Sequence, residues 1–469
     1  MSYLRFTNDG WYSRLDEDFC EPNVARIADA VAAFWYEQNP KGTVYIGFDT
    51  RQNAGSYAAI AAKAQAAWGL RTVVSDGPCP MPALNEAVRE DPEAIGALML
   101  TADHRSADYL GVRVRNADSS AISSEDAAHI EDLVSAEVDV PDVSFEVQDF
   151  VSPFLATMSS IIDVSLVRDA HLTAVVDPLF GTARGIAAPL LRSFGVDAME
   201  IHSAADANFG GLHPEVVEPW VDDLEYLIGQ TRSSFGVAID GPSNRSILVD
   251  ERGQLVSAPQ AHGLLLEHLV KHRGYGFLKG LSGRIVVPRF SSAMTRRLAD
   301  RLGCEVVAVA SGPTWPFDEI RRGNVLTASD GLGGICVPTF DRERNAFVTM
   351  LLLMEYIAAE KKPLSLLVDE FCAQVGKMEF GSKELRMDPG KYAVLRNLLP
   401  GVNPVLEGVG KEPVSVSHAD GLRVQYQDDS WLLVKPSLSE PLVRIYAEGP
   451  TKAERDNLLD GAKQLLKQL

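Results

Sequence analysis

The side chains best suited to chemistry stand where apolar, strand-length segments end. Asp103 and His104 follow the run Ala97–Thr101 after one alanine, and Arg113 comes soon after in a short Val-Arg-Val segment. A carboxylate, an imidazole and a guanidinium can attack an electrophile, move a proton or hold an anion. Because α/β proteins present chemistry at the ends of buried strands, this loop is the first candidate for an active site.

Two more polar loops hold the same position after a strand-length segment. One follows Phe235–Ile239 and carries Asp240 and Asn244. The other follows Asn324–Thr327 and carries Asp330. We expect all three loops to face one shared cleft.

A fourth polar motif lies near the C-terminus, between two strand candidates. It contains the cations Lys435 and Arg444 and the hydroxyls of Ser437 and Ser439. Cations, hydroxyls and loop amides suit a dianion such as a phosphate group. A surface turn with solvated serines is the alternative interpretation of the same residues.

The elements that must position these loops follow one plan three times. In each copy a strand is followed by a helix, a glycine that stops the helix, and a second strand. The copies place their first strands at 43–49, 172–177 and 284–288, their helices at 57–68, 186–194 and 293–302, and their second strands at 72–75, 198–201 and 305–309. This plan is typical of βαβ units with buried parallel strands, and the left-handed position that ends a helix suits Gly69, Gly195 and Gly303.

After about residue 364 the pattern changes. Lys361-Lys362-Pro363 suits a boundary because proline prevents a helix from continuing. The strand candidates and the terminal helix at 451–466 that follow predict an α+β module. The predicted fold class is α/β, with three similar mixed α/β (βαβ) domains and a smaller C-terminal α+β domain around a central cleft. We expect these domains at 1–150, 151–256, 257–364 and 365–469.

Composition limits the classes of function. Hydrophobic residues make up 46% of the chain and charged residues 23%, as in globular proteins. No apolar run approaches a membrane span and the N-terminus shows no secretory pattern, so we expect a cytoplasmic protein. The formal net charge of −20 argues against nucleic-acid binding and requires a locally basic pocket for an anionic ligand. The five scattered cysteines indicate neither a disulfide framework nor a zinc site.

Several motifs link the chain to a known family. Phe6–Trp11, Ile46–Arg51 and Lys435–Arg444 are similar to segments of the α-D-phosphohexomutases, the relatives of phosphoglucomutase and phosphomannomutase. Thr101–His104 also resembles that family's Thr-Ala-Ser-His, and the resemblance covers essentially the whole chain. It implies an isomerase of carbohydrate metabolism that interconverts hexose 1-phosphate and hexose 6-phosphate by intramolecular phosphotransfer. It also implies Mg²⁺ and a hexose bisphosphate activator.

The resemblance assigns a role to each candidate residue. Asp103 stands where the family has its phosphate-carrying serine, His104 matches the family's histidine, and Arg113 replaces a lysine. These three are the catalytic candidates. The substrate-binding candidates correspond to the family's sugar loop and phosphate loop, namely Asp330, Lys435, Ser437, Ser439 and Arg444.

The metal and sugar loops depart from the family pattern. The family's Asp-Gly-Asp-x-Asp-Arg appears as Asp240-Gly-Pro-Ser-Asn244-Arg, so two of the carboxylates that would hold Mg²⁺ are absent. A weak metal site of Asp240 and Asn244, completed by Asp103, is the remaining expectation. In the sugar loop Leu332 replaces a hydroxyl and cannot pair with a sugar hydroxyl.

These changes predict a phosphosugar-handling protein whose intramolecular phosphotransfer is lost or strongly impaired, that is, a pseudoenzyme. The alternative is an active phosphohexomutase with altered metal use and substrate. In both cases we expect a phosphosugar as the partner, and neither nucleic acid nor a membrane.

Overall fold

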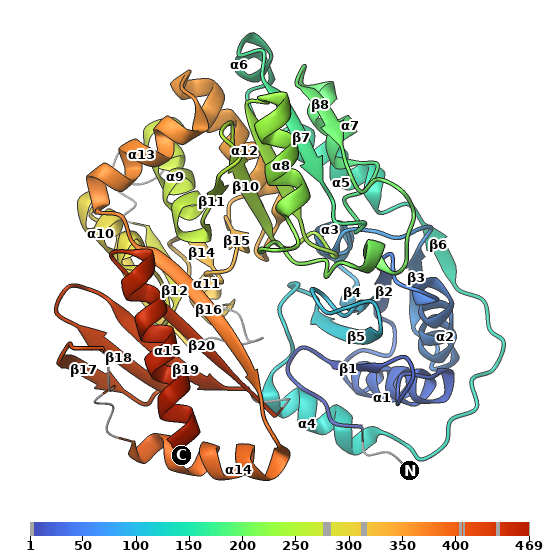
Figure 1. Cartoon of the computed structure of the whole chain (residues 1–469). Coiled ribbons are helices and arrows are strands. Elements are labelled where there is room, and N and C mark those ends of the chain that lie inside the picture. Colours follow the sequence, from blue (N-terminus) through green and yellow to red (C-terminus); the bar gives the residue numbers. More distant parts are fainter. Residues whose placement is uncertain are drawn as a thin grey trace.

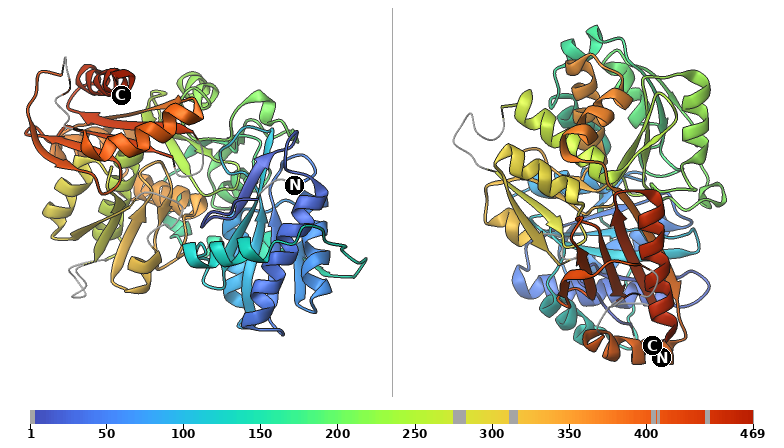
Figure 2. Two further views of the ribbon diagram at one scale, coloured as in Figure 1. Left: turned by 90° about the horizontal axis from the view of Figure 1, so that it is seen from below. Right: turned by 60° about the vertical axis from the view of Figure 1, so that its left-hand side comes forward.

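The computed structural model describes residues 4–274, 283–310, 317–402, 406, 409–437 and 441–468. Four sheets follow one another along the chain, and Figure 1 shows their domains in sequence order around the middle of the molecule. The two views of Figure 2 show the fourth domain (red) packed beside the third (yellow). Across the described residues, no helix is both long enough and apolar enough to cross a lipid bilayer.

The N-terminal sheet is mixed and has the order β1-β5-β4-β2-β3-β6. Tyr45 of its central strand packs with the core on the side of α3, whereas Val44 and Ile46 pack with the core on the side of α2. Helices thus cover both faces, which is why all residues of this strand except Phe48 are buried. The strands are β1 Trp11–Arg14, β2 Thr43–Phe48, β3 Arg71–Ser75, β4 Ala94–Leu100, β5 Tyr109–Asn116 and β6 Glu146–Gln148, and the helices are α1 Glu21–Gln38, α2 Ala54–Ala67, α3 Met81–Glu90 and α4 Ser124–Leu133.

The second and third sheets have the orders β11-β10-β9-β7-β8 and β13-β12-β14-β15. The second domain contains β7 Thr173–Asp177, β8 Asp197–Glu200, β9 Phe235–Ile239, β10 Ser246–Asp250, β11 Leu255–Val256, α5 Val151–Ser159, α6 Val164–Asp169, α7 Ala187–Ser193 and α8 Asp222–Thr231. The third contains β12 Arg284–Pro288, β13 Glu305–Val309, β14 Val325–Ser329, β15 Ile335–Cys336, α9 Ala258–Lys271, α10 Ala293–Leu302, α11 Phe317–Arg321, α12 Ala346–Glu360 and α13 Leu364–Val375.

The three α/β sheets repeat one topology, which confirms the predicted threefold plan. The strand orders β5-β4-β2-β3, β10-β9-β7-β8 and β15-β14-β12-β13 are equivalent. The last-named three strands of each set are parallel, and the first is antiparallel to its neighbour. The glycine that stops the helix has a φ of +84° at Gly69, +90° at Gly195 and +65° at Gly303, left-handed values that glycine adopts without strain. Each polar loop therefore joins a parallel strand to an antiparallel one at an equivalent edge.

The fourth sheet is antiparallel throughout, with the order β16-β20-β19-β18-β17. Alternate residues of β18 are buried, as in a sheet with one covered face, and α15 packs on β20 and β16. The predicted α+β module is thereby confirmed. Its elements are β16 Glu379–Arg386, β17 Pro413–Ser417, β18 Leu422–Tyr426, β19 Trp431–Pro436, β20 Leu442–Gly449, α14 Pro389–Leu398 and α15 Lys452–Gln468.

Helix α13 packs on α9 and α10 and so adds to the third domain. It begins after Pro363, and α12 before it ends at Glu360, as the Lys-Lys-Pro segment predicts. Since the fourth sheet begins only at Glu379, we place the start of the fourth domain after Val375 instead of after residue 364.

Candidate active site

A cavity of about 620 Å³ opens where the polar loops of the four domains meet. Asp103, Asp240, Asp330 and Lys435 line it from the first, second, third and fourth domains respectively, so the expected shared cleft is confirmed. Among the described residues, seven arginine or lysine side chains and five aspartates belong to its lining. The cleft is therefore locally basic in a chain of net charge −20 and suits an anionic ligand.

Arg51 fixes the loop that carries Asp103. Arg51 Nε pairs with Asp49 Oδ2 at 3.1 Å, and both side chains are fully buried. All five N–H groups of the guanidinium find acceptors, and arginine's planar fork holds them in a fixed geometry. Its terminal nitrogens donate at 2.6 to 3.0 Å to four carbonyl oxygens of the loop, those of Asp103, Arg105, Ser106 and Tyr109.

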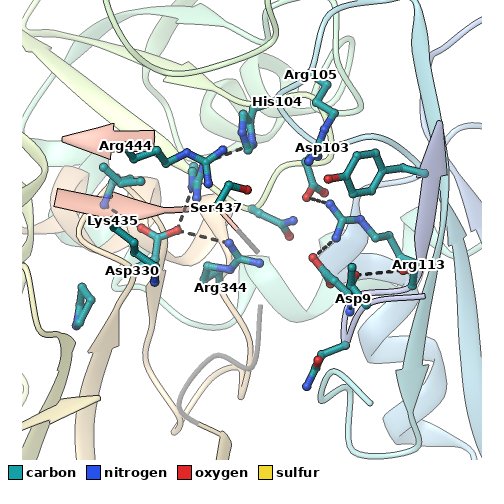
Figure 3. Close-up of a pocket in the computed structure, with 18 of the residues that line it drawn as sticks. Asp9, Asp103, His104, Arg105, Arg113, Asp330, Arg344, Lys435, Ser437 and Arg444 are labelled. Atoms are coloured by element: carbon teal, nitrogen blue, oxygen red, sulfur yellow. Dashed lines mark hydrogen bonds and ion pairs between the residues drawn. The ribbon is translucent and has the colours of Figure 1, made fainter. Parts of the chain in front are cut away.

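The Asp103 carboxylate is tied to Arg113. The Arg113 guanidinium, 5% exposed, contacts the carboxylates of both Asp103 and Asp9, and Figure 3 shows the two acids pointing toward it. Arg115 NH1 supports the arrangement by pairing with Asp9 Oδ1 at 2.7 Å. The Asp103 backbone has a φ of +53°, a left-handed conformation that aspartate tolerates better than most residues. The charge at position 103 is thus compensated in place.

His104 lies beside Asp103 as a neutral imidazole. Burial, together with the positive charges of Arg245 and Arg105, lowers the pKa of His104 well below its ordinary value. Its Nδ1 lies 3.5 Å from Arg245 NH1. Because arginine donates and never accepts, Nδ1 is the acceptor and the proton resides on Nε2. In this tautomer Nε2 is a donor suited to a phosphate oxygen.

The one carboxylate of the second loop, that of Asp240, accepts hydrogen bonds from the main chain of its own loop. Asp240 Oδ1 accepts hydrogen bonds from the main-chain nitrogens of Asn244 and Arg245 at 2.7 and 3.0 Å. Burial, with a smaller contribution from the Asp103 carboxylate, raises the pKa of Asp240 to about 7. Asn244 Oδ1 is buried and has no hydrogen-bond partner within the described part of the chain.

This donor set does not fit an octahedral Mg²⁺ shell, which requires several oxygen ligands and favours ionised carboxylates. The loop supplies one carboxyl group of raised pKa and one amide, since Pro242 contributes no side-chain oxygen. Within the described residues, no group of three or more His, Cys, Asp or Glu side chains is arranged to hold a metal ion.

Asp330 in the third loop orients two arginines. Its Oδ1 accepts hydrogen bonds from the main-chain nitrogens of Leu332 and Gly334 at 2.8 and 2.9 Å. Its Oδ2 accepts from Arg245 Nε at 2.8 Å and from Arg344 NH1 at 3.3 Å. Four donors occupy the lone-pair positions of a carboxylate. This carboxylate thus positions Arg245 and Arg344 at the cleft, and its predicted part in substrate binding stays a prediction.

Lys435 and Arg444 form the cationic end of the fourth domain. They stand directly opposite each other on β19 and β20, and Figure 3 shows them with Ser437 on the side of the cleft away from the first domain. Lys435 Nζ lies 2.9 Å from Asp420 Oδ1, and Arg444 Nε lies 2.6 Å from Glu384 Oε1. Burial lowers the pKa of Lys435, although Asp420 partly offsets it. A point charge beside a planar fork suits a phosphate group.

Three sequence profiles match consecutive parts of the chain. They are described as phosphoglucomutase/phosphomannomutase, alpha/beta/alpha domain I at residues 4–140, domain II at 152–253 and domain III at 260–375. The chain belongs to the phosphoglucomutase/phosphomannomutase family. The resemblance that the sequence motifs indicate is thereby confirmed.

Individual members of the family are similar over most of their length. A phosphoglucomutase/phosphomannomutase from Thermococcus kodakarensis is 23% identical over 403 residues, which cover 84% of each protein. A phosphopentomutase from the same organism is 28% identical over 403 residues, which cover 82% of this chain and 81% of the relative. The crystal structure of a phosphoglucomutase/phosphomannomutase family protein from Burkholderia thailandensis shares the fold, with a TM-score of 0.80 at 20% identity over 99% of this chain and 98% of that one.

Nine of the ten site residues predicted from the sequence come together in the cleft of this family member. The tenth, Ser439, lies outside the described residues. The nine that line the cavity are Asp103, His104, Arg113, Asp240, Asn244, Asp330, Lys435, Ser437 and Arg444.

Sequence reasoning missed several further residues of the cleft. Asp9 and Arg245 lie inside motifs that match the family, so a signal for them existed. Arg344 lies in no such motif and reaches the cleft through its contact with Asp330. Tyr12 directly follows the Phe6–Trp11 motif, and the guanidinium of Arg105 lies over its ring at 3.6 Å from the centroid. A cation is thus present at this part of the cleft.

Proposed function

We propose that this family member binds a phosphorylated sugar in its cleft and that its intramolecular phosphotransfer is lost or strongly impaired. The observation that carries the proposal is the contact of Asp103 with Arg113. The side chain at the position of the family's phosphate-carrying serine is a carboxylate already paired with a buried guanidinium, which Asp9 also contacts.

Phosphoryl transfer at position 103 requires an oxygen that is able to attack phosphorus. Pairing with Arg113 stabilises the Asp103 carboxylate and makes it a weaker nucleophile. Transfer to it would create an acyl phosphate at the expense of this pairing and would add negative charge near Asp9. Arg113 itself cannot serve as a general base, because arginine is not deprotonated in proteins.

Binding is supported by the charge of the cleft and by the fourth-domain motif. Lys435, Ser437 and Arg444 line the cleft, and we assign them, with Ser439, to one phosphate group. Arg245 and Arg344, which Asp330 orients, offer a second cationic group. A hexose monophosphate and a hexose bisphosphate are both candidate ligands on this basis.

Metal use is part of the proposal. A residual Mg²⁺ site would rest on Asp103, Asp240 and Asn244. Because Asp103 is paired with Arg113 and burial raises the pKa of Asp240 to about 7, we expect sugar-phosphate binding to be independent of Mg²⁺.

Calorimetric titration with glucose 1-phosphate tests binding. We expect Lys435→Ala/Arg444→Ala to weaken binding at least about tenfold, since hydrogen bonds to charged groups contribute roughly 1.5–3 kcal/mol each. The control, Lys63→Ala/Arg71→Ala, removes the same charge from partly exposed positions outside the cleft and should leave the affinity unchanged. We call Lys435 and Arg444 the phosphate clamp, and Lys435→Ala/Arg444→Ala the clamp variant. Equal affinity of the clamp variant and the wild type would contradict the proposal.

A coupled mutase assay tests turnover. Glucose 1-phosphate or mannose 1-phosphate is supplied with Mg²⁺ and a hexose bisphosphate, at high protein concentration. We expect no turnover above that of the Lys435→Ala/Arg444→Ala variant. Turnover by the wild type that the clamp variant lacks would instead establish the alternative, an active phosphohexomutase, and assign a new role to Asp103.

A further inference from the structure

One face of the fourth sheet carries both the phosphate clamp and an aromatic side chain. Lys435 pairs directly with Arg444, and Leu433 pairs with Tyr446 two residues farther along the same strands. Side chains two residues apart on a strand share a face, so Tyr446 lies on the face of Arg444, and both line the cleft. The atoms of a ligand that follow a phosphate held by Lys435 and Arg444 therefore lie near Tyr446.

An apolar wall extends from Tyr446 into the third domain. The ring of Tyr446 stacks on Phe290, with centroids 4.5 Å apart and planes inclined by 4°. Leu332 of the sugar loop packs against the buried cluster that contains this pair, and it lines the cleft together with Phe290 and Val309. The backbone of the sugar loop approaches Phe290 closely, because a Cβ on Gly331 would lie 2.7 Å from the Phe290 ring.

Asp330 and Arg344, the polar side chains of the third domain beside this wall, are poor hydrogen-bond partners for sugar hydroxyls. Asp330 Oδ1 and Oδ2 already accept four hydrogen bonds from the protein itself. Arg344 offers donors, which suit an anionic group better than the hydroxyls of a neutral ring. A sugar hydroxyl directed at Leu332 would lose its hydrogen bond to water and gain none, whereas a carbon at the same place would gain apolar contact.

We propose that the cleft prefers a phosphate monoester whose ring turns a hydroxyl-poor, apolar face toward Leu332, Phe290 and Tyr446. The substrate class is a deoxygenated or acylated sugar phosphate, as opposed to a fully hydroxylated hexose phosphate. The inference rests on the proposed phosphate clamp and adds the specificity of the group beside it. Leu332 is its specificity-determining residue.

Two probes isolate the ring from the phosphate. Cyclohexyl phosphate and glucose 1-phosphate share a six-membered ring and a phosphate monoester, and they differ in the ring hydroxyls. We expect cyclohexyl phosphate to bind the wild-type chain at least as tightly as glucose 1-phosphate, because a site built to pair hydroxyls rejects an analogue without them by factors of about 10⁴. Tighter binding of glucose 1-phosphate by about tenfold or more would overturn the inference.

Variants of Leu332 provide the second measurement. Leu332→Ser returns a hydroxyl to the loop and should shift the affinity ratio toward glucose 1-phosphate by about fivefold or more. Leu332→Ala, the matched control, removes apolar contact without adding a hydroxyl, so it should weaken cyclohexyl phosphate and leave glucose 1-phosphate nearly unchanged. An affinity ratio that neither variant moves would also overturn the inference.

Failure of the underlying function has a different signature. If neither phosphate binds, or if Lys435→Ala/Arg444→Ala binds both as the wild type does, the clamp itself is refuted and the specificity inference falls with it. If the clamp variant loses both ligands while glucose 1-phosphate remains preferred, the clamp stands and only the apolar specificity is wrong.

Discussion

Arg51 donates a hydrogen bond to the main-chain carbonyl of Asp103 at 2.7 Å. The same guanidinium binds three further carbonyls of the loop and is anchored by buried Asp49. Phe209 of the second domain lies over the guanidinium, 4.9 Å from ring centroid to carbon. Arg51 therefore sets the backbone path at position 103. It also connects this loop to Asp49 of the first domain and Phe209 of the second.

We expect Arg51→Lys to destabilise the fold and to weaken ligand binding. Lysine retains the charge but offers three donors on a flexible stem, so it leaves buried carbonyls unpaired at a cost of about 1–3 kcal/mol. Urea unfolding measures the loss of stability, and titration with glucose 1-phosphate measures the loss of affinity. Arg14→Lys is the control, because Arg14 makes partly exposed ion pairs. This substitution should lower the free energy of unfolding by under about 0.5 kcal/mol. Equal stability of the two variants would contradict this role of Arg51.

Asp103→Ser is expected to remain without turnover. The hydroxyl returns at position 103, but the metal loop still has one carboxyl group and the sugar loop still has Leu332. The coupled mutase assay checks turnover, and intact mass after incubation with a hexose bisphosphate checks for a phosphoryl group on the new serine. Asp103→Asn, similar in size to the wild type and unable to carry phosphate as serine does, is the control. Turnover by the serine variant alone would show that the other two loops are competent.

The threefold plan was predictable because each copy repeats short local signals. Apolar strand segments, a helical segment and a glycine at a left-handed position occur in the same order each time, and the structure confirms that order. Local signals were weaker for β16 and β17, whose residues are mostly half-buried or exposed. These edge strands depend on pairing with β20 and β18, which no short stretch of sequence reveals.

The sequence predicted most of the residues that line the cleft, but not which of their charged groups pair with one another. Motifs placed Asp103, Asp240 and Asp330 at equivalent strand ends of the three α/β domains, so their convergence followed from topology, whereas Lys435 belongs to a separate motif in the antiparallel fourth sheet. One of the donors to the Asp330 carboxylate is Arg344, which is 14 residues away in sequence and belongs to no motif. Pairing of buried charges is set by three-dimensional packing, so a linear pattern could not show which carboxylates are already compensated.

The free energy of unfolding should fall as pH rises from about 4 to about 7, because over this range Asp240 keeps a proton in the folded chain that it releases in the unfolded chain. Burial raises the pKa of its carboxyl group to about 7 in the folded chain, against about 3.9 in an unfolded chain. The folded state therefore binds a proton that the unfolded state has released across this window. The contribution of the protonated group is complete below the lower value and is lost as pH rises through the higher one, up to about 4 kcal/mol at 1.36 kcal/mol per unit.

Asp240→Asn checks this pH dependence. Asparagine can keep an oxygen for the main-chain donors of Asn244 and Arg245 and does not titrate. Urea unfolding of the variant and the wild type at pH 5 and pH 8 should show that the substitution stabilises the chain more at pH 8 than at pH 5. The same difference at both values would mean that Asp240 is already ionised in the folded chain at pH 5.

Mg²⁺ should leave the thermal stability of the wild-type chain unchanged, and carboxylates returned to the second loop should create a response. Pro242→Asp/Asn244→Asp restores the oxygen ligands of the family pattern beside Asp240. A ligand that binds the folded state at 100 times its Kd stabilises it by about 2.7 kcal/mol, so millimolar Mg²⁺ should raise the Tm of the variant and EDTA should reverse the rise. Pro242→Asn, which matches the first substitution in size without its charge, controls for the loss of proline. An EDTA-reversible rise of equal size in the wild type would show that Asp240, Asn244 and Asp103 hold the metal despite the pairing of Asp103 with Arg113.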